Sequence, residues 1–255
     1  MTPADRLERA IRSPRRPGRP AVMPYLVAGH PDPAGWDDLL LGVSDLADAI
    51  ELGVPFSDPM ADGPVIQRAG RRAIDAGVSL RWILDGLASL PRAPGCPIVL
   101  MSYLNPLLQY GLATLVDRAA EIDVAGFIVP DLPWEEGAEL RGLCEARGLA
   151  LIQLVTPVTP DERVRRLGAG RGGFTYAVTI TGITGGSVDL AARAAWLDRV
   201  RALSERPVCA GFGIRSRADV EALAGHADGA IVGTALVDAL ARGEDGVAWV
   251  RELVG

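Results

Sequence analysis

The chain has 255 residues, of which 49% are hydrophobic, and its formal net charge at pH 7 is −6. This length and composition suit one domain over residues 1–255, and the mild acidity gives no electrostatic basis for binding nucleic acid or an anionic membrane. No apolar run approaches the roughly 18–20 residues that span a bilayer, and the N-terminus lacks the apolar segment of a secretory signal. Three widely spaced cysteines without a CxxC pair indicate reduced, structural thiols, so we expect a cytoplasmic protein.

The sequence contains no lysine, so every basic residue other than histidine is arginine. A Schiff-base aldolase needs a lysine amine, and so does a protein that holds pyridoxal phosphate covalently. The two histidines, His30 and His226, are too few for a histidine-rich metal site. We therefore expect no metal and no cofactor, and a chemistry that rests on carboxylates, hydroxyls, arginine and backbone groups.

The first predicted element is a helix over Pro3–Ile11, which a basic and solvated connector follows up to residue 20. Short, nearly continuous apolar runs then predict buried parallel strands. These runs are Val22–Ala28, Ala47–Leu52, Pro97–Tyr103, Gly126–Val129, Ala150–Val155, Gly173–Val178, Pro207–Gly211 and Gly229–Gly233. Apolar residues at helical spacing predict helices between them, at Trp36–Leu46, Leu107–Ile122, Glu135–Arg147, Leu190–Leu203 and Ser216–Ala224.

Eight strand–helix units in a chain of this length predict an α/β protein with a single (β/α)₈ TIM barrel. The N-terminal helix would be an extra element that plugs the floor of the barrel. An open doubly wound sheet is the alternative, but it calls for a GxGxxG fingerprint after the first strand. The sequence has Gly29-His-Pro-Asp-Pro33 at that place, which does not supply the fingerprint.

The richest segment of the sequence runs from residue 47 to residue 67, as an apolar strand and then a loop of Pro, Gly and Asp. We expect Glu51 at the C-terminal tip of the strand and Asp58 and Asp62 in the loop. In a barrel the C-terminal ends of the strands form the active face, where a carboxylate is well placed for proton transfer. The plainer interpretations are an ion pair with arginine for Glu51, a turn for Asp62, and a turn or helix cap for Asp58.

Other polar and glycine-rich positions follow the later strands. Three glycine-containing segments, Gly182–Gly186, Gly211-Phe-Gly213 and Gly233-Thr234, come after the sixth, seventh and eighth strands. Loops at this rim and a helix N-terminus commonly bind phosphate, although such glycines also serve tight turns. Polar residues at the ends of the third, fourth and sixth strands are Tyr103, Asn105, Asp131, Tyr176 and Thr179.

The segment from Glu51 to Gln67, ELGVPFSDPMADGPVIQ, closely resembles the signature of tryptophan synthase α subunits. The resemblance extends along nearly the whole chain. It includes Pro24–Asp32, Tyr103–Pro106, Gly126–Pro133, Gly182–Gly185, Gly211–Ile214 and Gly233–Ala235. It implies the cleavage of indole-3-glycerol phosphate to indole and glyceraldehyde 3-phosphate, without metal or Schiff base.

The resemblance also implies roles for individual residues. Glu51 would transfer protons, and Asp62 would stay ionised and bind the indole N–H. The residues expected to bind the substrate or close over it are Tyr103, Tyr176, Thr184, Gly185, Phe212, Gly213, Gly233 and Thr234. Pro55, Asp58 and Asn105 would face a β subunit, in an α₂β₂ heterotetramer in which only the β subunit carries pyridoxal phosphate.

Three other functions stay open on the sequence. The chain could be a stand-alone indole-releasing lyase of a secondary pathway. It could also be a mainly non-catalytic barrel that activates a β partner, although the presence of both Glu51 and Asp62 argues against this. A sugar-phosphate isomerase would share the phosphate site but has no evident need for the acidic loop.

Overall fold

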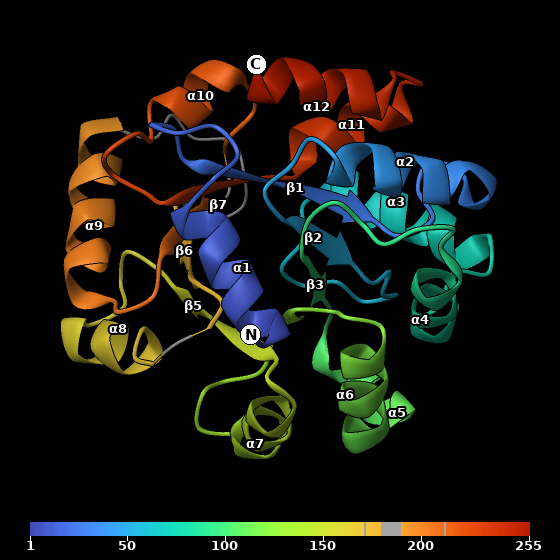
Figure 1. Ribbon diagram of the computed structural model, residues 1–255, viewed down its shortest axis with the longest axis horizontal. Coiled ribbons are helices and arrows are strands. Elements are labelled where there is room, and N and C mark those ends of the chain that lie inside the picture. Colours follow the sequence, from blue (N-terminus) through green and yellow to red (C-terminus); the bar gives the residue numbers. More distant parts are fainter. Residues whose placement is uncertain (171, 180–189, 212) are drawn as a thin grey trace.

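The computed structural model describes the whole chain except residues 171, 180–189 and 212. Eight parallel strands pair in sequence order, and the first strand also pairs with the eighth, which closes the sheet into a barrel (Figure 1). The predicted (β/α)₈ fold is thus confirmed. The strands are β1 (Ala21–Val27), β2 (Ile50–Gly53), β3 (Ile98–Met101), β4 (Gly126–Ile128), β5 (Ala150–Val155), β6 (Thr175–Val178), β7 (Val208–Gly211) and β8 (Gly229–Val232).

Helices surround the barrel on its outer side, apart from α1, which lies across one end (Figure 1). In chain order they are α1 (Pro3–Arg12), the 3₁₀ helix η1 (Pro33–Gly35), α2 (Trp36–Ser44), α3 (Pro64–Asp75), α4 (Leu80–Ser89), α5 (Leu104–Tyr110), α6 (Leu112–Glu121), α7 (Ala138–Arg147), α8 (Asp161–Leu167), α9 (Leu190–Leu203), α10 (Arg217–Glu221), α11 (Thr234–Ala241) and α12 (Gly246–Val254). No helix in the described ranges combines the length and the apolar composition needed to cross a membrane.

Side chains of alternate strand residues fill two cores, one inside the barrel and one between the barrel and the helices. In β5, Ala150 and Ile152 belong to the inner core, whereas Leu151 and Val155 belong to the outer one. This period of two follows from the pleat of a strand. A polar side chain at one of the alternate positions that the inner-core residues occupy therefore points into the barrel.

Helix α1 closes the N-terminal end of the barrel, as predicted. Its buried residues Leu7 and Ile11 join the inner core. The backbone of Ala4 fixes it in place, because Ala4 N donates to Gly148 O at 3.0 Å and Ala4 O accepts from Gly173 N at 3.0 Å. Figure 1 shows α1 lying across the centre of the barrel.

The basic segment after α1 links it to β1 and is largely exposed to solvent, as expected of a connector, but its arginines also bind the barrel floor. Arg15 Nε donates to Ala47 O at 2.9 Å, and Arg16 Nη1 donates to Leu46 O at 3.2 Å. Further along, Arg19 Nη1 donates to Val254 O at 3.3 Å. The arginines satisfy carbonyl groups at the ends of neighbouring elements and tie the segment to the start of β2 and to the C-terminus.

Several predicted elements differ at their ends for local reasons. The helix expected over Leu107–Ile122 is two helices, because Gly111 between α5 and α6 has a left-handed φ of 94°. The third strand stops at Met101, since Tyr103 is the N-cap of α5. The second strand starts only at Ile50, because the side chain of Asp48 accepts the Val22 N–H at 2.8 Å. The predicted helices did not include α3, α4, α8 or α12, whereas the start of α11 agrees with the helix start expected at Gly233-Thr234.

Candidate active site

Glu51 lies inside the barrel rather than at the tip of its strand. It is the second residue of β2 and is 3% exposed, between Ile50 and Leu52 of the outer core. Its side chain therefore shares the inner face with Ala49, which belongs to the inner core. The position is deeper than the sequence predicted, and it places a carboxyl group in an apolar interior.

Burial determines the protonation of Glu51. Loss of water around the carboxyl, and then the nearby charge of Asp62, raise the pKa of Glu51 from 4.5 to about 8. Its Oε2 atom is buried and has no hydrogen-bond partner among the described residues. At pH 7 Glu51 therefore carries a proton that it can give to a bound molecule.

Asp62 lies in the loop between β2 and α3, where neighbouring elements hold it. Burial raises its pKa from 3.8 to about 6, while a hydrogen bond from the Tyr103 hydroxyl opposes the rise. The same hydroxyl accepts the Ala61 N–H at 2.9 Å, and Gln67 Nε2 donates to Asp62 O at 2.9 Å. Tyr103 thus anchors the acidic loop to the end of β3, and Asp62 is mostly ionised at pH 7.

The two carboxyl groups differ in protonation at neutral pH, although Asp62 is close enough to Glu51 for its charge to raise the pKa of Glu51. Glu51 is mostly protonated and Asp62 mostly ionised. Two acids whose environments separate their pKa values are the usual arrangement of an acid and a charged partner in catalysis. An ion pair between Glu51 and arginine, the plainer interpretation, does not agree with a raised pKa.

Two further tyrosines line the same interior. Tyr176 is the second residue of β6, and Tyr25 of β1 lies opposite Glu51 in the strand register. Burial raises the pKa of both phenols well above 10, and the charges of Glu51 and Asp62 add to the rise. Tyr25 was not predicted as a site residue, although its alternation with the inner-core residues Ala21 and Met23 is a signal in the sequence that points to it.

The expected phosphate site is described in part. Gly213 follows β7 with a left-handed φ of 78°, and Gly233 is the N-cap of α11, where Thr234 is the first residue. Backbone N–H groups at this helix start have no partner within the helix and suit an anion. A Cβ atom on Gly233 would lie 3.3 Å from Tyr25 Cβ, so this end of the site adjoins the tyrosine beside Glu51. Phe212, Thr184 and Gly185 lie outside the described residues.

The residues expected to face a partner lie on the same rim but away from the interior. Pro55 is half-buried, whereas Asp58 and Asn105 are exposed. Large apolar side chains stand exposed near them, with Met60 82% and Leu108 54% exposed. Neither Met60 nor Leu108 was predicted as a site residue.

Cys96, Cys144 and Cys209 are buried free thiols, in agreement with the structural role predicted for them. Within the ranges that the structure describes, no group of three or more His, Cys, Asp or Glu residues is arranged to hold a metal ion.

Comparisons with known proteins point to one family. Residues 11–252 match the family model described as tryptophan synthase alpha chain. A tryptophan synthase alpha chain of Nitratidesulfovibrio vulgaris (strain DP4) is 46% identical over 250 residues, which are 97% of each chain. One of Roseiflexus castenholzii is 46% identical over 245 residues, which are 94% of each chain.

Solved structures agree with the sequence relatives. Tryptophan synthase of M. tuberculosis in an aminoacrylate-bound form is similar with a TM-score of 0.87 and 35% identity, over 98% of each chain. The tryptophan synthase α subunit of Legionella pneumophila str. Paris has a TM-score of 0.86 and 32% identity, over 100% of this chain and 96% of that one. The chain therefore belongs to the tryptophan synthase α-chain family.

Proposed function

We propose that Glu51 and Asp62 together carry out the retro-aldol cleavage of indole-3-glycerol phosphate to indole and glyceraldehyde 3-phosphate, a step of tryptophan biosynthesis. The observation that carries this proposal is the pair of carboxyl groups, Glu51 buried and Asp62 half-buried, with separated pKa values of about 8 and about 6. The family to which the chain belongs supports the choice of substrate.

Glu51 acts first as an acid. The bond between indole C3 and the glycerol carbon breaks only when C3 has received a proton, since indole is otherwise a poor leaving group. The protonated carboxyl of Glu51 gives this proton. The resulting carboxylate then accepts the proton of the adjacent glycerol hydroxyl while the carbon–carbon bond breaks and the aldehyde forms. Glu51 returns to its protonated state, and no cofactor is consumed.

Asp62 stabilises the positive intermediate. Protonation at C3 places positive charge on the indole ring, and a carboxylate beside the ring N–H lowers the energy of that cation. This role needs Asp62 to stay ionised, and the hydrogen bond from Tyr103 favours the ionised form. Tyr176 belongs to the same barrel interior and positions the ring.

The phosphate of the substrate binds at Gly213, Gly233 and Thr234. The left-handed Gly213 and the start of α11 bring backbone N–H groups to one rim of the barrel. An anion at a helix start needs no lysine, which agrees with a sequence that has none. The absence of lysine also means that this chain cannot hold pyridoxal phosphate as a Schiff base, so that cofactor belongs to a partner.

The partner is a tryptophan synthase β subunit, bound to the rim that carries Pro55, Asp58 and Asn105. Two exposed apolar side chains near these residues, Met60 and Leu108, support an interface there, because large apolar groups gain most from being covered. We propose an α₂β₂ complex for the assembly.

Indole release from indole-3-glycerol phosphate tests the catalytic proposal. Glu51→Gln cannot donate the proton and Asp62→Asn cannot balance the cation, so each should lower kcat at least 100-fold. Asp75→Asn is the control, since this exposed carboxylate on α3 pairs with Arg71 at the surface. If Glu51→Gln releases indole at the wild-type rate, the mechanism is wrong.

The same assay with an added β subunit tests the partner. We expect slow release by the isolated chain and a large increase in the complex. Replacing Met60 by Ser should weaken the increase without altering release by the isolated chain. Fast release that does not respond to a β subunit would indicate a stand-alone lyase instead.

A further inference from the structure

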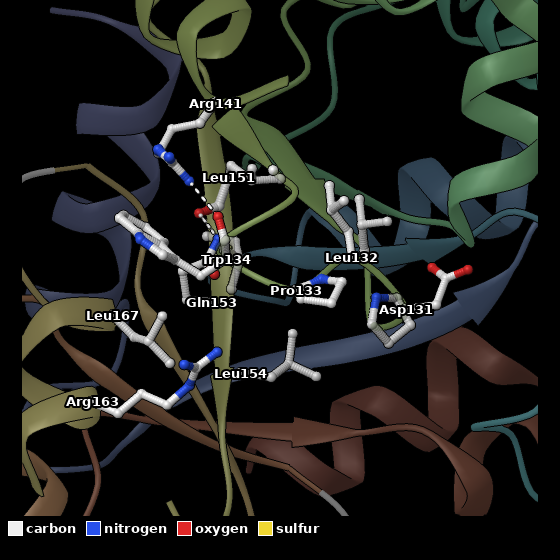
Figure 2. Close-up of a pocket in the computed structure, with 14 residues that line it drawn as sticks. Asp131, Leu132, Pro133, Trp134, Arg141, Leu151, Gln153, Leu154, Arg163 and Leu167 are labelled. Carbon is white, nitrogen blue, oxygen red and sulfur yellow. Dashed lines mark hydrogen bonds between the residues drawn. The ribbon is translucent and has the colours of Figure 1, made fainter. Parts of the chain in front are cut away.

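A separate cavity of about 230 Å³ lies outside the barrel, between the segment after β4, the helix-facing side of β5, and helices α7 and α8 (Figure 2). We call it the Trp134 cavity. Its apolar wall includes Leu132 and Leu167. Its polar groups come from Asp131, Arg141, Gln153 and Arg163, and the Asp131 carboxylate already accepts the Leu104 N–H at 2.9 Å. Neither Glu51 nor Asp62 lines it, so the cavity is distinct from the proposed active site.

Gln153 is the unusual residue of this cavity. It is 8% exposed and lies on the face of β5 where its neighbours Leu151 and Val155 are both apolar. Its amide can make about four hydrogen bonds. Among the described residues its side chain makes one, a long bond of 3.3 Å from Nε2 to Leu151 O. Neither amide atom of Gln153 is among the enclosed side-chain atoms that lack a partner, so the rest of the amide is open to the cavity and available to a ligand.

Two arginines supply positive charge around Gln153. The Arg141 guanidinium lies over the Trp134 ring, 3.8 Å from the ring centroid, and its Nη1 donates to Trp134 O at 3.1 Å. These contacts fix the indole ring as a firm wall. Arg163 extends from α8 toward Gln153 and Leu154 in Figure 2, so its charge faces the cavity.

The present partner of Arg163 can be exchanged. Arg163 binds Glu135 with two hydrogen bonds of 2.7 and 2.9 Å, and this pair lowers the pKa of Glu135 to about 2. The two side chains are 40% and 49% exposed, however. An ion pair in water of this kind stabilises little, so an incoming carboxylate can replace or join Glu135.

We propose that the Trp134 cavity is a second binding site, which takes a small aromatic carboxylate of one or two rings. The ring packs between Trp134 and the leucines, the carboxylate binds Arg163, and Gln153 donates to the ligand from the strand. Cavities for drug-sized molecules begin at about 300 Å³. This cavity is somewhat smaller, at about 230 Å³, which suits a smaller ligand of one or two rings. The proposal does not depend on the lyase activity.

Calorimetric titration of the full chain with indole-3-carboxylate tests the site, with neutral indole titrated in parallel. Gln153→Leu removes the amide and Arg163→Gln removes the charge. The matched controls are Gln109→Leu, at an exposed position of α5, and Arg166→Gln, an exposed residue of the same helix α8. We expect saturable binding of the carboxylate that weakens at least tenfold in the first two variants and stays unchanged in the controls.

The thermal stability of Gln153→Leu separates a binding role from a packing role. Leucine suits the apolar face of β5 at least as well as an amide that is open to the cavity, so the variant should melt at the same or a higher temperature than the wild type. A lower Tm together with lost binding would assign Gln153 to packing and overturn the proposal. Absence of binding, binding that Gln153→Leu and Arg163→Gln leave unchanged, or equal affinity for indole would also overturn it.

Discussion

Replacing Glu51 by glutamine should make the fold more stable at neutral pH while it abolishes catalysis. Glu51 is 3% exposed, and burial is the main reason that its pKa rises from 4.5 to about 8. Glutamine has nearly the same shape but never ionises. The variant therefore lacks the loss of folding free energy that arises when a buried carboxyl group resists ionisation. The size of this loss depends on pH and can be calculated.

The sign and size of the effect follow from proton linkage. Between pH 4.5 and about 8 the folded chain keeps a proton on Glu51 that the unfolded chain has lost. Stability therefore falls as pH rises through this window, by up to about 1.4 kcal/mol per pH unit. At pH 7 the accumulated cost is about 3 kcal/mol, it levels off above pH 8, and it vanishes below pH 4.5.

Urea unfolding at pH 5, 6, 7 and 8 measures this difference directly. The stability of Glu51→Gln relative to wild type should increase steadily across the series. At pH 7 the gain of about 3 kcal/mol corresponds to roughly 6–12 °C in Tm for a domain of this size. Glu139→Gln, at an exposed position of α7, is the control and should show no such trend. A difference that does not grow with pH would refute the account of Glu51 as a buried acid.

Three other changes test the surroundings of the site and the floor of the barrel. Tyr103→Phe removes a hydrogen bond that lowers the pKa of Asp62. The acidic limb of the profile of kcat/KM against pH should therefore move to higher pH by roughly one unit, and a limb at the same pH would contradict this role of Tyr103. Leu7→Ala leaves a cavity under the barrel, and urea unfolding should show a loss of about 3 kcal/mol, whereas a loss below 1 kcal/mol would mean that α1 does not seal the floor. Burial lowers the pKa of His30, so its own contribution to stability should fall as pH drops below 6.5, by up to about 1.4 kcal/mol per pH unit and opposite in sign to that of Glu51. Urea unfolding should therefore show His30→Gln gaining stability relative to wild type as pH falls from 6.5 to 5, and a constant difference would contradict this.

The barrel could be predicted from the sequence because its strands are buried on both faces and read as short apolar runs. The run over Ala150–Val155 became β5 with the same bounds. Where a predicted strand proved too long, the cause was a side chain that binds the backbone, as Asp48 does ahead of β2. Such contacts join residues far apart in sequence, so local patterns do not reveal them.

The chemistry of the site was predictable only in part. A carboxylate in an apolar strand marks Glu51, but its depth depends on the exact register between β1, β2 and β3. The hydrogen bond from Tyr103 to Asp62 joins two loops and leaves no trace in the spacing of either. Gln153 gave a visible signal, a polar residue among apolar ones in a strand, yet its significance appears only when the cavity beside it is known.

The distribution of arginine explains how Glu51 can act as an acid. The chain has 26 basic residues other than histidine, all of them arginine. Among the described residues, the charges that shift the pKa of Glu51 come from Asp62 and not from any arginine. One guanidinium beside Glu51 would lower its pKa by about 1–3 units and offset part of the effect of burial, so a substantial fraction would be ionised at pH 7. The ionised fraction has no proton for indole C3. The chemistry, as well as packing, therefore requires that no arginine lie beside Glu51 in the barrel interior. The arginines instead bind groups at the barrel floor and at the surface.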